Sequence, residues 1–276
     1  MKKVIPRIEF LVQSFFRKQE FCPHCQSSKI KNLAKKYFTI KVKKCGNCYL
    51  CFTDPIYRPL LVSSLYDNLY VGNGSTTRLP NSDELVQLKN NCFESSDKHF
   101  GNRIKAIKLL GSGCKILEIG SSWGYFLYQA KNHGFEATGV EISEPRRLFG
   151  TENLGVRIVE NISTLKGEFF DIVYTSHVLE HFTDVSTIFV DIHKLLNKKG
   201  KLIIEVPNFD FSIFRERALP TVGAVHPLGF SSEFFQKNLP KYNFKITGFY
   251  NSWDSFPEGK VEKSSQGVII LIAEKN

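Results

Sequence analysis

A glycine-containing segment near the middle of the chain most narrows the folds open to it. Residues 115–127 read KILEIGSSWGYFL, an apolar strand that ends at Ile119, a short loop and the start of a helix. Gly120 permits a tight turn there, and Gly124 lets the loop pass close to a ligand at the helix N-terminus. The segment therefore predicts the first strand–loop–helix crossing of a Rossmann-like sheet.

Acidic residues beside this loop indicate the charge of its ligand. The G-x-G-x-x-G spacing of a pyrophosphate-binding loop is absent, and Glu118 stands two residues before Gly120 instead. A carboxylate at a strand end suits a cationic ligand. Glu141, at the end of the next apolar run, can accept both hydroxyls of a ribose. A generic α/β turn with incidental acids is the competing interpretation.

The segments that follow alternate between strand and helix. Their near-continuous apolar runs are typical of parallel strands buried under helices on both faces. The last two strands, separated by a turn at 257–259, suggest an antiparallel hairpin that closes the sheet edge. We expect strands at 115–119, 137–142, 172–175, 201–206, 243–250 and 267–273, and helices at 81–110, 124–133, 143–150, 184–196 and 231–239.

Five of the seven cysteines are crowded near the N-terminus. Two C-x2-C pairs nineteen residues apart match the spacing of a four-thiolate zinc ribbon, with ligands Cys22, Cys25, Cys45 and Cys48. Four thiolates leave no position for water, so the expected zinc is structural. We expect Gly46 to supply the unusual backbone of the second pair, Cys51 to be a buried thiol and His24 to lie at the surface. Free thiols in a disordered leader are the alternative.

The net charge of +10 is concentrated in the same region. The first 60 residues hold 13 Lys and Arg against 3 Asp and Glu, so the remainder is neutral. A basic module attracts anionic partners such as nucleotides, phosphorylated groups or nucleic acid, and a Lys-rich solvated surface is the alternative. No apolar stretch approaches the ~20 residues of a transmembrane segment. No signal-peptide cleavage pattern is present either, so we expect a cytoplasmic protein.

Several motifs together resemble a known family. KILEIGSSWGYFL, GVEIS, FDIVYTSHVLEHF and GKLIIEVPN occur in the order seen in class I S-adenosylmethionine-dependent methyltransferases. CPHC, CGNC, YLCFTDP and LYDNLY are similar to the subgroup with an N-terminal zinc ribbon, whose members often act in polysaccharide, deoxysugar or natural-product biosynthesis. Ser122 departs from the family, which usually has a second glycine there, but its backbone N–H is still available.

The resemblance implies a Rossmann-like, doubly wound, mostly parallel seven-stranded sheet with an antiparallel edge hairpin. It divides the chain into an N-terminal helix and zinc ribbon (1–60), a helical linker or lid (61–110) and a methyltransferase domain (111–276). It implies two cofactors, S-adenosylmethionine and a structural Zn²⁺. The candidate contacts of S-adenosylmethionine are Glu118, Gly120, Ser121, Ser122, Trp123, Gly124, Tyr125, Phe126, Glu141, Ile142, Asn161, Ile162, Thr175, Ser176 and His177.

Methyl transfer is an in-line displacement from a sulfonium, so the protein supplies alignment and, for a hydroxyl acceptor, a base. His226 is the preferred base, because it lies in the irregular passage after Pro207 that we expect to roof the acceptor pocket. His177, at a strand end, is expected to line the methyl pocket. His181, which we expect to begin the following helix with Glu180, is more a scaffold residue. Other expected roof residues are Phe209, Phe211, Phe214, Arg215, Arg217 and Phe230.

Three functions are consistent with these features. The first is O-methylation of a small or glycan-precursor acceptor, phosphorylated, phosphoramidate-like or nucleotide-linked, in cell-surface polysaccharide or natural-product biosynthesis. The second is RNA methylation with the ribbon as RNA grip, which the few aromatic residues among its lysines disfavour (Tyr37, Phe38 and Tyr49). The third is a non-catalytic protein that uses this fold to bind a ligand.

The chain also lacks the Asn/Asp-Pro-Pro-aromatic tetrapeptide that several amino-group methyltransferases carry after the fourth strand. Ser176-His177 occupies that region.

Overall fold

The computed structural model describes residues 18–36, 40–57, 78–111, 113–210, 212, 222–223 and 225–276. The helix predicted over residues 5–16 lies outside these ranges. So do Tyr37, Phe38 and four of the expected roof residues, Phe211, Phe214, Arg215 and Arg217. The division into 1–60, 61–110 and 111–276 stays a prediction. No helix in the described ranges is both long and apolar enough to span a bilayer.

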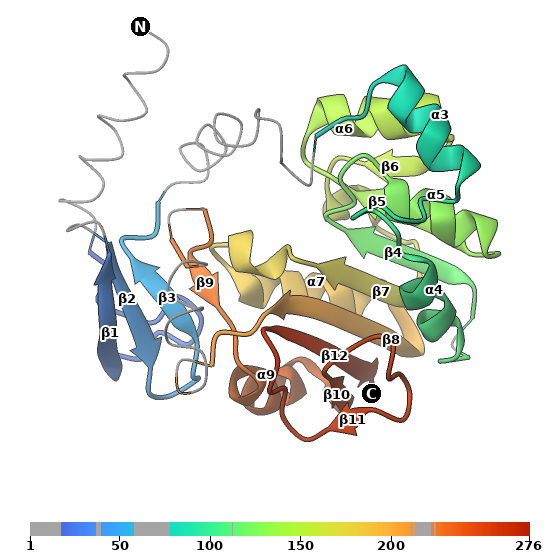
Figure 1. Ribbon diagram of the computed structural model, residues 1–276. Coiled ribbons are helices and arrows are strands. Elements are labelled where there is room, and N and C mark those ends of the chain that lie inside the picture. The colour runs from blue at the N-terminus through green and yellow to red at the C-terminus, as the bar shows by residue number, and fades with distance from the viewer. Residues whose placement is uncertain are drawn as a thin grey trace, which may run out of the picture.

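The larger sheet has the order β11-β10-β12-β8-β7-β4-β5-β6 (Figure 1). The strands from β8 to β6 are parallel, and β12 and β10 complete the sheet in antiparallel pairing. The Rossmann-like arrangement and the antiparallel edge are therefore confirmed. The strands are β4 (Lys115–Ile119), β5 (Glu136–Val140), β6 (Arg157–Val159), β7 (Phe170–Ser176), β8 (Leu196–Pro207), β10 (Phe244–Tyr250), β11 (Lys260–Val261) and β12 (Val268–Lys275).

The sheet has eight strands in the described residues, and the prediction of seven was wrong by one. The additional strand β11 is only two residues long and pairs with the end of β10. Two residues carry no periodicity that a sequence can reveal. Strand β6, three residues long, was not located from the sequence for the same reason.

Helices cover both faces of this sheet. Successive residues of a strand point to opposite faces, so Tyr174 of β7 packs with Phe126 of α5, whereas its neighbour Val173 packs with Phe189 of α7. The segment 81–110 forms two helices, because Cys92, Phe93 and Ser95 adopt positive φ and break it. The helices are α3 (Ser82–Asn90), α4 (Gly101–Lys108), α5 (Tyr125–Asn132), α6 (Glu144–Phe149), α7 (Val185–Leu195) and α9 (Ser232–Asn238), with short turns at Gly150–Leu154, Ile162–Leu165, Leu179–His181 and Leu239–Tyr242.

The cysteine-containing region forms a second, smaller sheet of order β1-β2-β3-β9 (Figure 1). Its first strands are β1 (Ile30–Lys36), β2 (Ile40–Cys45) and β3 (Cys51–Asp54), and its fourth is β9 (Leu228–Gly229), from the other end of the chain. Cys51 is buried, as predicted. Leu50 and Phe52 belong to the same hydrophobic core as α7 and α9. The small sheet thus shares a strand and a hydrophobic core with the part of the chain that carries α7 and α9.

Candidate functional site

The glycine loop after β4 is held in a left-handed backbone. Gly120, Ser122 and Gly124 have φ values of +79°, +50° and +82°. A Cβ atom at Gly120 would collide with the side chain of Val178, and one at Gly124 would lie 2.7 Å from Val156. Ser122 thus adopts the left-handed backbone that glycine favours, so the loop keeps this conformation despite the departure from the family pattern.

Two buried carboxylates flank the loop. Glu141 accepts hydrogen bonds from the backbone N–H groups of Ser122 (3.0 Å) and Ser143 (2.9 Å), so it is tied to the loop. Glu118 is 6% exposed, and its Oε2 has no hydrogen-bond partner among the described residues. Burial and the nearby charge of Glu141 raise the pKa of Glu118 well above the ordinary carboxyl value. A cation bound here would supply the missing partner.

Further unpartnered polar atoms surround the loop. The buried hydroxyls of Ser121, Ser122 and Thr175 have no hydrogen-bond partner in the described part of the chain. Ile142, directly after Glu141, is 79% exposed, so its side chain offers an apolar surface beside the carboxylate. A polar ligand with an apolar ring fits this set of groups, as expected for S-adenosylmethionine.

Other predicted cofactor contacts have different surroundings. The side chains of Trp123 and Phe126 are buried in the hydrophobic core and pack against other aromatic rings, so they anchor the loop to the core. Tyr125 is half-buried against Phe100. Asn161 accepts a hydrogen bond from the N–H of Ser163 and caps the short helix that begins at Ile162, and Ser176 is the last residue of β7.

His177 follows β7 directly and lies between two buried carboxylates. Its Nδ1 is 3.6 Å from Glu180, its Nε2 is 3.9 Å from Glu205, and 47% of the side chain is exposed. Burial lowers the pKa of His177, but the hydrogen bond and charge of Glu180 and the charge of Glu205 outweigh it, so the pKa is raised. The backbone of His177 is left-handed, with φ of +53°, which turns its side chain out at the strand end.

The residues around Glu205 were not predicted from the sequence. Glu205 is 3% exposed and forms an ion pair with Arg103 at 3.1 Å. It also accepts hydrogen bonds from Tyr174 (3.1 Å) and Trp253 (3.0 Å). One signal was visible, an acid inside the apolar run of residues 202–206; Arg103, on a polar helix, offered none.

A cavity of about 320 Å³ adjoins this ion pair. It lies between α4, the end of β8 and the start of β12, and most of its lining is polar. Lining side chains that can form hydrogen bonds include His99, Asn102, Arg103, Asn251, Ser252 and Asp254. The cavity can therefore hold a hydroxyl-rich molecule close to His177.

Glu180, which His177 contacts through Nδ1, belongs to a second group of side chains. Potential ligand atoms of Glu180, His181 and His226 all lie within 4.8 Å of one another. The prediction that His181 begins the following helix was wrong. His181 ends a short 3-10 helix, and α7 starts only at Val185, capped by Asp184. The three histidines singled out in the sequence thus converge on Glu180.

The four predicted zinc ligands also come together. The Sγ atoms of Cys22 and Cys48 are 3.4 Å apart, and those of Cys25 and Cys45 are 3.6 Å apart. Tetrahedral Zn–S bonds of about 2.3 Å place sulfur atoms about 3.8 Å apart, so the cluster is compatible with zinc. N–H groups of residues 47 and 48 also point at the sulfur of Cys45.

Two expectations about this cluster were wrong. Gly46 does not have positive φ; the left-handed residues are Gln26 (φ +56°) and Tyr49 (φ +66°), each directly after the second cysteine of its pair. The turn is therefore completed one residue later than expected. His24 is half-buried, and its Nε2 lies 2.9 Å from the hydroxyl of Tyr242. This contact links the ribbon to the short helix Leu239–Tyr242 that follows α9.

The fold and the loop define a class I methyltransferase site, and comparison with known proteins agrees. A model of the family described as "Methyltransferase domain" matches residues 90–247, more than half of the chain. The chain belongs to this family, whose cofactor is S-adenosylmethionine.

One curated relative is the ubiquinone biosynthesis O-methyltransferase of Azorhizobium caulinodans, 27% identical over 139 residues. These residues make up 48% of this chain and 53% of the relative, so the match spans about half the length of that protein.

Solved structures share the fold. A TehB-like SAM-dependent methyltransferase from Corynebacterium glutamicum matches with a TM-score of 0.51 and 15% identity, over 70% of this chain and 97% of that one. The plantazolicin methyltransferase BpumL, solved with a pentazolic desmethylPZN analog and SAH, matches with a TM-score of 0.51 and 14% identity, over 71% of this chain and 92% of that one. At these identities the likeness concerns the fold alone.

Proposed function

We propose that the protein transfers the methyl group of S-adenosylmethionine to a hydroxyl oxygen of a small, polar acceptor, most simply a glycan precursor. The observation that carries this proposal is the arrangement along one sheet edge. The carboxyl ends of β5, β4, β7 and β8 are neighbours, and they carry, in that order, Glu141, Glu118, His177 and Glu205. Two acids for a cationic nucleoside thus lie beside an exposed imidazole.

Each residue has a role that follows from its surroundings. S-adenosylmethionine supplies an electrophilic methyl group when bound. Glu118, whose buried Oε2 has no hydrogen-bond partner within the described ranges, would receive the ammonium group. Glu141 would accept the ribose hydroxyls next to the exposed side chain of Ile142. His177 is placed to take the proton of the acceptor hydroxyl, between the two carboxylates that orient its ring.

The acceptor class is argued from the cavity beside His177. Its amide, hydroxyl, imidazole and guanidinium groups match a molecule with several hydroxyls, and Arg103 and Asp254 bring charges of both signs. The name of the relative from Azorhizobium caulinodans, an O-methyltransferase, supports oxygen as the acceptor atom. We propose further that this methylation takes place in polysaccharide or natural-product biosynthesis.

The ribbon is proposed to hold a structural zinc ion and to attract an anionic acceptor. Some of its lysines are engaged within the protein: Lys43 pairs with Asp54 at 2.7 Å, and Lys44 with Glu233 at 3.6 Å. From the first zinc-ligand pair to β2, the described lysines with exposed side chains are Lys29, Lys31, Lys35 and Lys41. A test of anion or RNA binding should therefore change these four and leave Lys43 and Lys44 intact.

The experiment is a tritiated-methyl transfer screen against nucleotide-linked sugars, phosphorylated metabolites and RNA. We expect label in a hydroxyl acceptor and a fall of about 10²–10⁴-fold in rate for His177→Asn, because general base catalysis contributes that much. Asn tolerates left-handed backbone, so the variant should fold. His133→Gln, at the far end of α5, is the matched control.

Two results would contradict the proposal. Absence of S-adenosylmethionine binding in calorimetry would favour a non-catalytic protein. Labelled RNA, lost on neutralising the four exposed lysines, would favour the RNA methyltransferase.

A further inference from the structure

Glu180 is a buried carboxylate that lacks a full set of partners. It is 3% exposed, and its Oε2 has no hydrogen-bond partner among the described residues. Its Oε1 lies 3.6 Å from the imidazole of His177, at the long end of an ion pair. A carboxylate that is buried without compensation is costly, so a positive group beside Oε2 is expected.

Two imidazoles lie close to the carboxylate of Glu180, with potential ligand atoms within 4.8 Å. The rings of His181 and His226 are 4.4 Å apart between centroids and nearly perpendicular. Nδ1 of His181 lies 3.0 Å from the carbonyl oxygen of Val225. If Nδ1 carries the proton and donates it to this carbonyl, Nε2 carries the lone pair. Such a contact to backbone is the usual way in which a protein orients a metal-binding histidine.

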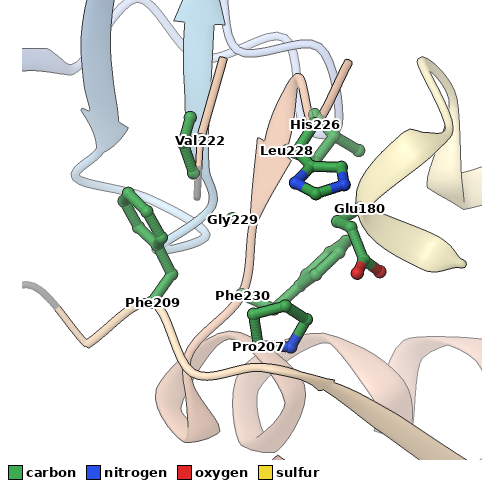
Figure 2. Close-up of a pocket in the computed structure, with 8 residues that line it drawn as sticks. All are labelled: Glu180, Pro207, Phe209, Val222, His226, Leu228, Gly229 and Phe230. Carbon is green, nitrogen blue, oxygen red and sulfur yellow. The ribbon is translucent and has the colours of Figure 1, made fainter. Parts of the chain in front are cut away.

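A small cavity meets these side chains. Its volume is about 10 Å³, close to the space of one water molecule, and Glu180 and His226 lie together on one side of it (Figure 2). Phe209 and Val222 lie on the opposite side (Figure 2). The space is thus large enough for a single ion, and its remaining walls are mostly apolar.

From these observations we propose that Glu180, His181 and His226 form a second metal site, which holds one divalent transition-metal cation. Two imidazoles and a carboxylate suit Zn²⁺, Fe²⁺ or Co²⁺ better than Mg²⁺ or Ca²⁺. The ligand atoms lie within 4.8 Å of one another, so rotation of the side chains brings all three onto one ion. Three protein ligands leave coordination positions open for an outside oxygen.

The position of this site suggests its use, which rests on the proposed function. His177 contacts Glu180, and Val178 lies over Gly120 of the cofactor loop. A cation held by Glu180 is therefore next to the residue expected to take the proton of the acceptor. Such a cation would hold the carboxylate of Glu180 in place beside the imidazole of His177.

The ribbon holds the third ligand in place. The N–H of Thr53 donates to the carbonyl of Pro227 at 2.9 Å, and Phe52 pairs with Leu228 in β3–β9. His226 precedes this segment directly. The ribbon thus fixes the position of a side chain that lies 46 residues after Glu180 and 45 after His181 along the chain.

The test is a titration of the full-length chain, with its ribbon zinc retained and loosely bound metal removed, with Co²⁺. We expect one further equivalent of Co²⁺, with visible absorption but without the near-ultraviolet charge-transfer bands of thiolate ligation. Glu180→Gln and His226→Gln should each weaken this binding by at least about tenfold, and His133→Gln should not change it. All three variants should bind S-adenosylmethionine like the unaltered chain, which shows that they are folded.

If the unaltered chain binds no further equivalent of Co²⁺, the proposed metal site is refuted. It is also refuted if both Glu180→Gln and His226→Gln still bind that equivalent. Co²⁺ bound by a chain that methylates no hydroxyl acceptor would support the metal site and contradict the proposed function. A chain that binds no further Co²⁺ but methylates a hydroxyl acceptor in a His177-dependent reaction would support the proposed function and contradict the metal site. The two proposals therefore fail separately.

Discussion

Replacing Gly120 with alanine tests whether the cofactor loop depends on close approach or only on backbone freedom. The φ of +79° at Gly120 makes any L-residue strained there, at a cost of about 1–2 kcal/mol. In addition, the new Cβ would collide with Val178, and overpacking of this kind costs about 1–3 kcal/mol. We expect Gly120→Ala to lower the free energy of unfolding by about 2–5 kcal/mol.

A matched control separates the two contributions. Gly155 also has left-handed backbone, with φ of +61°, but no heavy atom lies within 4 Å of its Cβ position. Gly155→Ala should therefore cost only the conformational part, about 1–2 kcal/mol. Shortening the colliding side chain with Val178→Ala should recover part of the loss in the Gly120→Ala background, a coupling of about 0.5–3 kcal/mol.

Urea unfolding followed by tryptophan fluorescence measures these differences, since Trp123 and Trp253 are both buried. Calorimetric titration with S-adenosylmethionine follows the loop itself, and the affinity of Gly120→Ala should fall while that of Gly155→Ala is kept. Equal destabilisation by the two alanines, together with no recovery from Val178→Ala, would refute the argument from close approach.

Two further predictions concern charge and metal. Because the pKa of Glu118 is raised in the folded protein, the native state binds more protons than the unfolded state above the ordinary carboxyl pKa. The free energy of unfolding should therefore fall as pH rises through this window, and S-adenosylmethionine affinity should rise as the carboxylate forms. Glu118→Gln should remove both trends in urea and calorimetric measurements, and a pH-dependent affinity that persists in the variant would contradict the assignment. Cys45→Ser should lose the ribbon zinc in elemental analysis, whereas Cys92→Ser, at an exposed thiol, should keep it; equal metal content in both would contradict the four-cysteine site.

Much of the site could be predicted because its determinants are close together in the chain. Glu118, Gly120 and Gly124 lie on one strand–loop–helix crossing, and the cofactor loop needs those residue types at that spacing whatever surrounds it. The paired cysteines are similar, because two ligands of each pair are fixed by one turn.

Other expectations failed where neighbouring structure overrode the local pattern. The helix expected at 184–196 is present, but Glu180 and His181 do not begin it, because the left-handed backbone at His177 and the cap at Asp184 divide the segment. Gly46 was expected to have the unusual backbone, yet Gln26 and Tyr49 have it, since the turn closes after the second cysteine.

By itself the sequence therefore determined the fold class, the glycine loop flanked by Glu118 and Glu141, and the set of four cysteines that come together, because each depends on spacing within short segments. Only the tertiary structure brought Arg103 to Glu205, joined β3 of the ribbon to β9, and placed His226 beside Glu180. These contacts join residues far apart in the chain, and their geometry follows from how whole elements pack. The sequence around His226 gives no sign that this side chain lies beside Glu180. The pairing of β9 with β3 of the ribbon places it there.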